Sequence, residues 1–410
     1  MRFVHVIDMV IFLLLFMDIN CFLVKFNFDD ETRHPKSDIY LDSIQLIERY
    51  HYPVERHVVL TEDGYLLNTF RIPRNGPPVL LAHGIGDSSD SWLVLGPTSS
   101  LSFMLADAGF DVWIYNARGN RYSKKHVNAV PPQEFWDFSF EEMGTQDMPA
   151  TIDYILERTY MKTLTYIGYS QGTTAFFIMC SVKPEYNEKI NHAILLAPVA
   201  WLTHTKYPFI AFFNEILSEL MQFSKKSDVY EVFPFNKRLN FYHAKVCNTT
   251  ASYSFLCHIE LYLNFGVRNL LDLSPERLPV ITSHIPAGVS AKTFFHFLQL
   301  YGSKRFQRFD YGENKNRQIY SSLIPPEFNV SSITVPSSIF VSEIDWFSDE
   351  KDTNLLKNKL KHIERFNVIN MSNQFTHLEF VYGTRVKEFI NKPVINILKE
   401  LKILDTVDIR

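Results

Sequence analysis

The stretch that most constrains this chain reads Gly-Tyr-Ser-Gln-Gly at residues 168–172. An apolar, β-favouring run at residues 164–167 precedes it, and residues 173–179 can continue as a buried helix. A strand, a sharp turn with Ser170 at its apex and a helix is the context in which a G-x-S-x-G motif presents a nucleophilic serine. Glycine tolerates the crowding and the unusual backbone angles that such a turn requires. The alternative interpretation is an ordinary Gly/Ser turn between a strand and a helix.

Strand-like and helix-like segments alternate on both sides of this motif. A β-hairpin with an Asp-Gly turn is expected over residues 54–72. The further strands are expected at residues 79–82, 111–115, 193–196, 335–341 and 366–370. The helices are expected at residues 38–50, 100–108, 148–158 and 386–401. Asp147 is the expected N-cap of the helix at residues 148–158. This alternation predicts a mostly parallel α/β sheet with flanking helices.

The alternation stops between residues 200 and 334, where the chain is rich in Phe, Tyr and Leu with helical spacing. We expect a mainly helical cap with a lid there, inserted over the active edge of the sheet. The core would then consist of residues 22–199 and 335–410. A separate second domain is the alternative, but the sheet pattern resumes directly after the insertion.

A serine nucleophile needs a general base, an acid that orients the base, and an oxyanion hole. In the α/β-hydrolase fold these residues follow in the chain order Ser, Asp or Glu, His, each at a strand end. Asp345 directly follows an expected strand and His377 follows the last one, so Ser170, Asp345 and His377 are the candidate catalytic residues. Asp349 is the second candidate for the acid, and Asp345 could instead be a helix N-cap.

The oxyanion hole in this fold uses two backbone N–H groups. One belongs to the residue after the nucleophile, which is Gln171. The other is expected from Ile85, in the loop that follows the strand at residues 79–82. The alternative for this loop is an ordinary strand-ending turn. No Cys or His spacing suggests a metal site, and this chemistry requires no cofactor.

The N-terminal region and three sequons point to the secretory route. Residues 1–21 contain an apolar run that is too short to span a bilayer and is typical of a signal peptide, with cleavage after Cys21. An uncleaved interfacial anchor is the alternative. N-x-S/T glycosylation sequons begin at Asn248, Asn329 and Asn370. A secreted or lumenal protein is therefore expected.

The remaining cysteines are compatible with that compartment, and the net charge bears on the partners of the protein. Cys247 and Cys257 could close a small loop, as an oxidising compartment would allow, and Cys180 is expected to be a buried free thiol. The formal net charge of −4 carries no signature of nucleic-acid binding. No protein partner can be inferred.

Several further stretches resemble one known family. They are Tyr-Pro-Val-Glu-Arg-His at residues 52–57, Asn-Ala-Arg-Gly-Asn at 116–120, Phe-Trp-Asp-Phe-Ser-Phe at 135–140, the motif with its two following threonines at 168–174, and Pro-Ala-Gly at 286–288. Together with Asp345 and His377, they make the chain similar to the acid lipase family of animals, which contains gastric lipase, lysosomal acid lipase and insect relatives. The chain departs from that family at Tyr169, Glu379 and Gly86, where His, Asp and Leu are usual.

The resemblance implies a lipase that cleaves carboxylic esters of neutral lipids, triacylglycerol or sterol ester, at a lipid–water interface. It also implies a disulfide between Cys247 and Cys257. Two rival hypotheses remain. One is a soluble esterase for short-chain esters, and the other is a non-catalytic lipid-binding protein on the same fold, since a fold does not determine function.

Overall fold

The structure, a computed structural model, describes the backbone of residues 37–407 and the side chains as far as residue 401. The expected signal peptide at residues 1–21 and its cleavage after Cys21 lie outside the described residues. No helix between residues 37 and 407 combines the length and the apolar character needed to cross a membrane.

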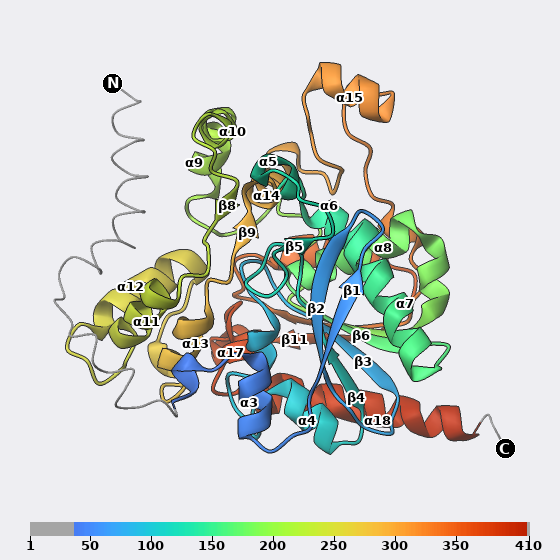
Figure 1. The fold of residues 1–410 in the computed structure, drawn as a ribbon, viewed down its shortest axis with the longest axis vertical. Helices are drawn as coiled ribbons and strands as arrows, with labels where there is room; N and C mark the ends of the chain where they lie inside the picture. Colours follow the sequence, from blue (N-terminus) through green and yellow to red (C-terminus); the bar gives the residue numbers. More distant parts are fainter. Residues whose placement is uncertain (1–36, 408–410) are drawn as a thin grey trace.

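A nine-stranded sheet forms the centre of the molecule (Figure 1). Eight strands follow the order β1-β2-β4-β3-β6-β7-β10-β11, and β5 pairs with β2. Their bounds are β1 (Glu55–Leu60), β2 (Tyr65–Ile72), β3 (Pro78–Ala82), β4 (Asp111–Ile114), β5 (Lys125–His126), β6 (Leu164–Tyr169), β7 (Ile190–Leu196), β10 (Ser337–Ser342) and β11 (Ile363–Ile369). From β4 to β11 every pair is parallel, whereas β1 and β2 form the predicted antiparallel hairpin. The predicted mostly parallel sheet is therefore confirmed.

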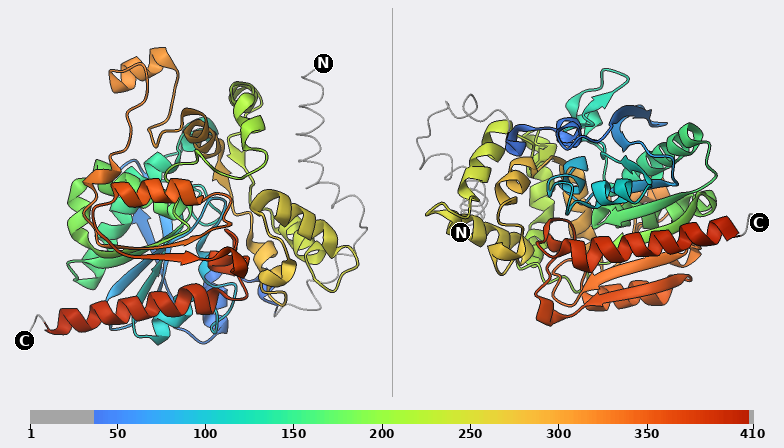
Figure 2. Two further views of the ribbon diagram at one scale, coloured as in Figure 1. Left: turned by 180° about the vertical axis from the view of Figure 1, so that it is seen from behind. Right: turned by 90° about the horizontal axis from the view of Figure 1, so that it is seen from below.

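Helices cover both faces of this sheet because its strands are apolar on both sides. Leu81 and Ile167 pack into one core with α3, α4 and α18, while Leu80 and Tyr166 pack into a second core with α7, α8 and α16. Successive side chains of a strand point to opposite faces, so two buried faces require continuous apolar runs. The bounds of these helices are α3 (Ser43–Arg49), α4 (Leu101–Asp107), α7 (Met148–Thr159), α8 (Gln171–Val182), α16 (Glu350–Lys359) and α18 (Lys392–Val407). Figure 2 shows α18 running along the sheet.

The expected N-cap at Asp147 is wrong, because the helix begins earlier. Ser139 caps it together with Glu142 in a reciprocal capping box, a signal that the sequence Ser-Phe-Glu-Glu carries. The helical segment then continues through α6 (Phe140–Glu142) and a π-helical turn (Met143–Asp147) into α7. Asp147 instead turns inward and pairs with the buried guanidinium of Arg118 at 2.6 Å. A charged partner distant in the sequence thus determines the role of this carboxylate.

The insertion between β7 and β10 is mainly helical, as expected, with one short antiparallel pair of strands. Its elements are α9 (Ile210–Glu215), α10 (Leu217–Lys226), β8 (Glu231–Val232), α11 (Lys237–Val246), α12 (Ser254–Phe265), α13 (Leu278–His284), β9 (Val289–Ser290), α14 (Ala291–Ser303) and α15 (Glu313–Tyr320). Figure 1 shows α9 to α14 gathered around one end of the sheet. A disulfide joins Cys247 to Cys257, as predicted, and Cys180 is a buried free thiol.

Candidate active site

Ser170 is the single residue between the end of β6 and the start of α8, and its backbone angles are φ 51° and ψ −117°. A residue other than glycine with these angles is strained, and the surrounding structure must hold it there. Its two flanking glycines make the turn sterically possible. A Cβ added to Gly168 would lie 2.9 Å from the carbonyl carbon of Gly172, and one added to Gly172 would lie 2.4 Å from the Ala82 oxygen. The predicted strand, sharp turn and helix are therefore present.

The structure brings Ser170, His377 and Asp345 into one hydrogen-bonded chain. Ser170 Oγ lies 2.9 Å from His377 Nε2, and His377 Nδ1 lies 2.8 Å and 3.0 Å from the two carboxylate oxygens of Asp345. All three side chains are buried. With its Nδ1–H donating to Asp345, the imidazole leaves Nε2 available to accept the serine proton.

Asp345 and Asp349 have different surroundings, although they are only four positions apart in the sequence. The Asp345 carboxylate accepts the N–H groups of Phe347 at 2.8 Å and Ser348 at 3.1 Å, in the loop that follows β10. These bonds hold its oxygens toward His377. Asp349 is the N-cap of α16 and pairs with Lys206 at 2.9 Å. The helix-capping role that was the alternative for Asp345 thus belongs to Asp349.

His377 lies in a short segment that precedes α17 (Glu379–Tyr382). The Tyr169 hydroxyl donates to the His377 carbonyl at 3.0 Å, and the rings of Tyr169 and Phe347 lie 5.3 Å and 5.1 Å from the imidazole. Glu379 is fully buried beneath this segment and accepts the Thr376 N–H at 2.5 Å. Burial raises the pKa of Glu379 to about 7. The Tyr169 and Phe347 contacts depend on the fold, and no sequence spacing predicts the Phe347 contact.

The loop after β3 lies against Ser170. A Cβ added to Gly84 would lie 2.9 Å from the Tyr169 ring and 3.4 Å from the Ser170 Cβ. His83 holds this loop, because its Nδ1 donates to the Gly84 carbonyl at 2.8 Å while its Nε2 accepts the Ala117 N–H at 3.1 Å. Burial lowers the pKa of His83 to about 4, so the imidazole is neutral and both bonds persist at neutral pH.

The two expected oxyanion donors are unengaged by other protein groups. Among residues 37–407, neither the Ile85 N–H nor the Gln171 N–H donates to a protein acceptor. Gly86 anchors the same loop to the insertion, because its carbonyl accepts the Ala287 N–H at 2.8 Å. One free N–H group therefore belongs to this loop, at Ile85, and the other belongs to Gln171, which directly follows the buried Ser170.

The three expected glycosylation sites are accessible, and the cysteine pair is a disulfide. Asn248, Asn329 and Asn370 are all exposed, as a glycosylated asparagine must be. Cys247 and Cys257 lie near His243, but the disulfide leaves no thiolate to ligate a metal there.

This fold, with a serine on a strained turn after a central parallel strand, is that of an α/β hydrolase. The family model of the α/β hydrolase fold matches residues 77–381, and the family model of the partial α/β-hydrolase lipase region matches residues 43–96. The α/β hydrolase GrgF from Penicillium sp. has the same fold, with a TM-score of 0.50 at 15% identity over 83% of this chain and 96% of its own.

Sequence relatives narrow this class to one family. Lipase 1 of Drosophila melanogaster is 37% identical, covering 90% of this chain and 82% of its own length. Human gastric triacylglycerol lipase is 35% identical, covering 90% and 94%. The chain belongs to the animal acid lipase family, as its resemblance predicted, and it is a lipase that hydrolyses carboxylic esters.

Proposed function

We propose that this lipase cleaves neutral lipid esters, triacylglycerol or sterol ester, through a Ser170–His377–Asp345 triad and an acyl-enzyme. The observation that carries the proposal is the continuous hydrogen-bonded chain from Ser170 Oγ through both imidazole nitrogens to Asp345. Removing or misplacing any member of such a unit disables the others, because they act together on one proton.

The reaction begins when His377 Nε2 accepts the Ser170 proton and Oγ attacks the ester carbonyl. The N–H groups of Ile85 and Gln171 stabilise the negative oxygen of the tetrahedral intermediate. The imidazolium, which Asp345 stabilises, then donates the proton to the departing alcohol. Water repeats the sequence on the acyl-enzyme and releases the fatty acid.

The insertion at residues 200–334 acts in this proposal as a cap on a core formed by residues 22–199 and 335–410. Its residues 207–213 form the lid. Tyr207 stacks on Phe347 with ring centroids 5.5 Å apart, and Phe347 in turn contacts His377. A segment that rests on the ring beside the base is well placed to control access to it.

The cap surface supports action at a lipid–water interface. Its exposed apolar side chains include those of Phe223, Phe233, Phe255, Ile259 and Tyr262. The last three share one face of α12 at helical spacing, and the ring of Tyr262 contacts Trp346, which directly follows Asp345. This apolar face therefore continues into the loop that carries the catalytic acid.

The substrate class and the compartment follow from relatives and chemistry together. Rat and human relatives are named gastric triacylglycerol lipases, which favours a triacylglycerol substrate. The family and the disulfide support an extracellular or lumenal location.

The test combines a fluorophosphonate probe, which labels the active serine of hydrolases, with a panel of substrates. We expect labelling at Ser170 in folded protein and faster turnover of emulsified triacylglycerol or sterol ester than of a dissolved short-chain ester. Absence of labelling would favour a non-catalytic lipid-binding protein. Labelling with turnover of the dissolved ester alone would favour the soluble esterase.

A further inference from the structure

A buried hydrogen bond joins the loop that carries Ile85 to the segment that carries His377. The Tyr382 hydroxyl, at the end of α17, donates to Asp87 Oδ2 at 2.6 Å. Asp87 lies two residues after Ile85, and Tyr382 lies five residues after His377. Both side chains are buried, and the two residues are 295 positions apart in the sequence.

The buried position of the Asp87 carboxyl costs free energy in the folded protein. It is enclosed in the core, and burial raises its pKa to about 7. Besides Tyr382 it accepts the N–H of Ser88 at 2.7 Å. Replacing both partners of a buried hydrogen bond with apolar side chains of the same shape can be nearly neutral or stabilising, so stability alone does not explain this pair. Its position between two catalytic loops offers a geometric reason.

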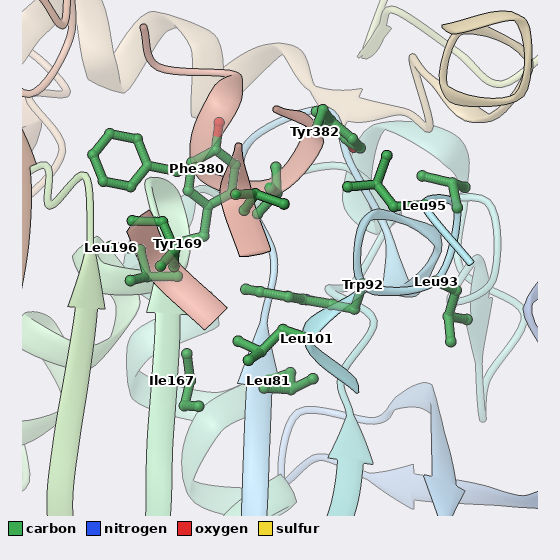
Figure 3. Packing of buried hydrophobic residues seen from close by; sticks show 14 of the residues in the cluster. Leu81, Trp92, Leu93, Leu95, Leu101, Ile167, Tyr169, Leu196, Phe380 and Tyr382 are labelled. Atoms are coloured by element: carbon green, nitrogen blue, oxygen red, sulfur yellow. The ribbon is translucent and has the colours of Figure 1, made fainter. Parts of the chain in front are cut away.

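A second tyrosine completes a set of links among the three loops of the site. Tyr169, directly before the nucleophile, donates to the His377 carbonyl, and its ring packs against Gly84. Figure 3 shows Tyr169 beside Phe380 and Leu196, while Tyr382 extends from α17 toward Leu95 in the segment after β3. Tyr169 therefore joins the turn at Ser170 to the segment that carries His377. The Tyr382–Asp87 bond joins that segment to the loop that carries Ile85.

We propose that Asp87 and Tyr382 are positioning residues whose hydrogen bond sets the Ile85 N–H relative to His377 and Ser170. The proposal rests on the triad and oxyanion hole proposed above. The bond spans the two groups that must act on one tetrahedral carbon, the proton carrier and the oxyanion donor. Loss of this hydrogen bond lets the loop that carries Ile85 shift. The tetrahedral intermediate is then stabilised less, whereas substrate binding is unchanged.

The test is Tyr382→Phe, which removes one oxygen atom and retains the packing of the ring. We expect kcat on a dissolved short-chain ester to fall about tenfold at unchanged KM, because small displacements of a catalytic group cost one to two orders of magnitude. The inhibition constant of an alkyl boronic acid, which forms a tetrahedral adduct with the serine, should rise by the same factor. A purely structural role would not move the inhibition constant in proportion to kcat.

Tyr186→Phe is the matched control. Tyr186 is also buried and donates to a carboxylate, that of Asp153, at 2.8 Å, but it lies beside α7 and α8 away from the catalytic loops. The Tyr186→Phe variant should have the kcat and the inhibition constant of the wild-type enzyme. If instead both tyrosine variants lose activity equally, the effect is general and the positioning role is wrong.

Asp87→Ala and the double variant Asp87→Ala/Tyr382→Phe test whether the two residues act through the same hydrogen bond. Tyr382→Phe should reduce kcat no further when Asp87 is already Ala, since the bond is absent in both. Additive effects would overturn the proposal, as would unchanged kcat in Tyr382→Phe. Each of these results presupposes an active wild-type enzyme, whereas an inactive wild type would refute the proposed function itself.

Discussion

Gly84→Ala tests how closely the loop after β3 must approach Ser170, the proposed nucleophile. The φ angle of Gly84 is not positive, so alanine can adopt its backbone conformation. The added Cβ would lie 2.9 Å from Tyr169 Cε1, 3.1 Å from Tyr169 Cδ1 and 3.4 Å from Ser170 Cβ. Carbon atoms in contact normally lie about 3.5–4.0 Å apart, so the loop or the ring must move by roughly 0.6 Å or more.

Tyr169 cannot easily recede, because it is buried and its hydroxyl is bonded to the His377 carbonyl. The displacement therefore falls on the loop that carries Ile85, or passes through Tyr169 to His377. Either result misplaces a catalytic group, and kcat/KM should fall by about 10–100-fold. The overpacking should also lower the free energy of unfolding by about 1–3 kcal/mol.

The assay measures initial rates on a dissolved short-chain ester, together with urea unfolding. Gly109→Ala is the control for lost stability alone. Gly109 has φ +86°, nothing lies within 4 Å of its added Cβ, and it occupies the remote turn between α4 and β4. That variant should lose about 1 kcal/mol of stability through backbone strain at wild-type kcat/KM. A Gly84→Ala enzyme within threefold of wild-type kcat/KM would refute the close approach of the loop.

Three further predictions concern the nucleophile, the lid and a buried carboxyl. Ser170→Ala should fold and lose activity on the order of a million-fold, and ester hydrolysis within tenfold of wild type would exclude Ser170 as the nucleophile. Activity should rise once substrate forms droplets, and deleting residues 207–213 should reduce that rise more than it reduces hydrolysis of a dissolved ester. A smooth saturation curve through the solubility limit, unchanged by the deletion, would argue against a lid. Burial raises the pKa of Glu379 from its usual 4.5 to about 7. Between pH 4.5 and pH 7 the folded protein therefore keeps a proton on Glu379 that the unfolded chain has released. The free energy of unfolding consequently falls as the pH rises through this range. Glu379→Gln should lessen the decline between pH 5 and pH 8 by about 1–3 kcal/mol in urea unfolding, and an unchanged pH dependence would contradict the raised pKa.

Much of the fold was predictable because its signals are local. The apolar runs, the Asp-Gly hairpin turn and the glycines beside Ser170 act over a few residues, where steric limits and burial leave little choice. The pair Cys247 and Cys257 belongs to the same class, since a separation of 10 residues needs only a short loop to bring the sulfurs together. The chain order Ser170, Asp345, His377 was also readable, because parallel strands place successive carboxyl ends at one edge of the sheet.

What only the tertiary structure decided depends on contacts between distant residues. Asp345 and Asp349 both follow β10, and the path of the loop brings the first to His377 and makes the second a helix cap. Asp147 looked like a cap, yet it pairs with Arg118 from another loop. The Asp87–Tyr382 bond has no sequence signal at all. By itself the sequence predicted which residues could do the chemistry. Packing determined which of them meet, because a hydrogen bond between distant residues depends on strand register and burial rather than on spacing along the chain.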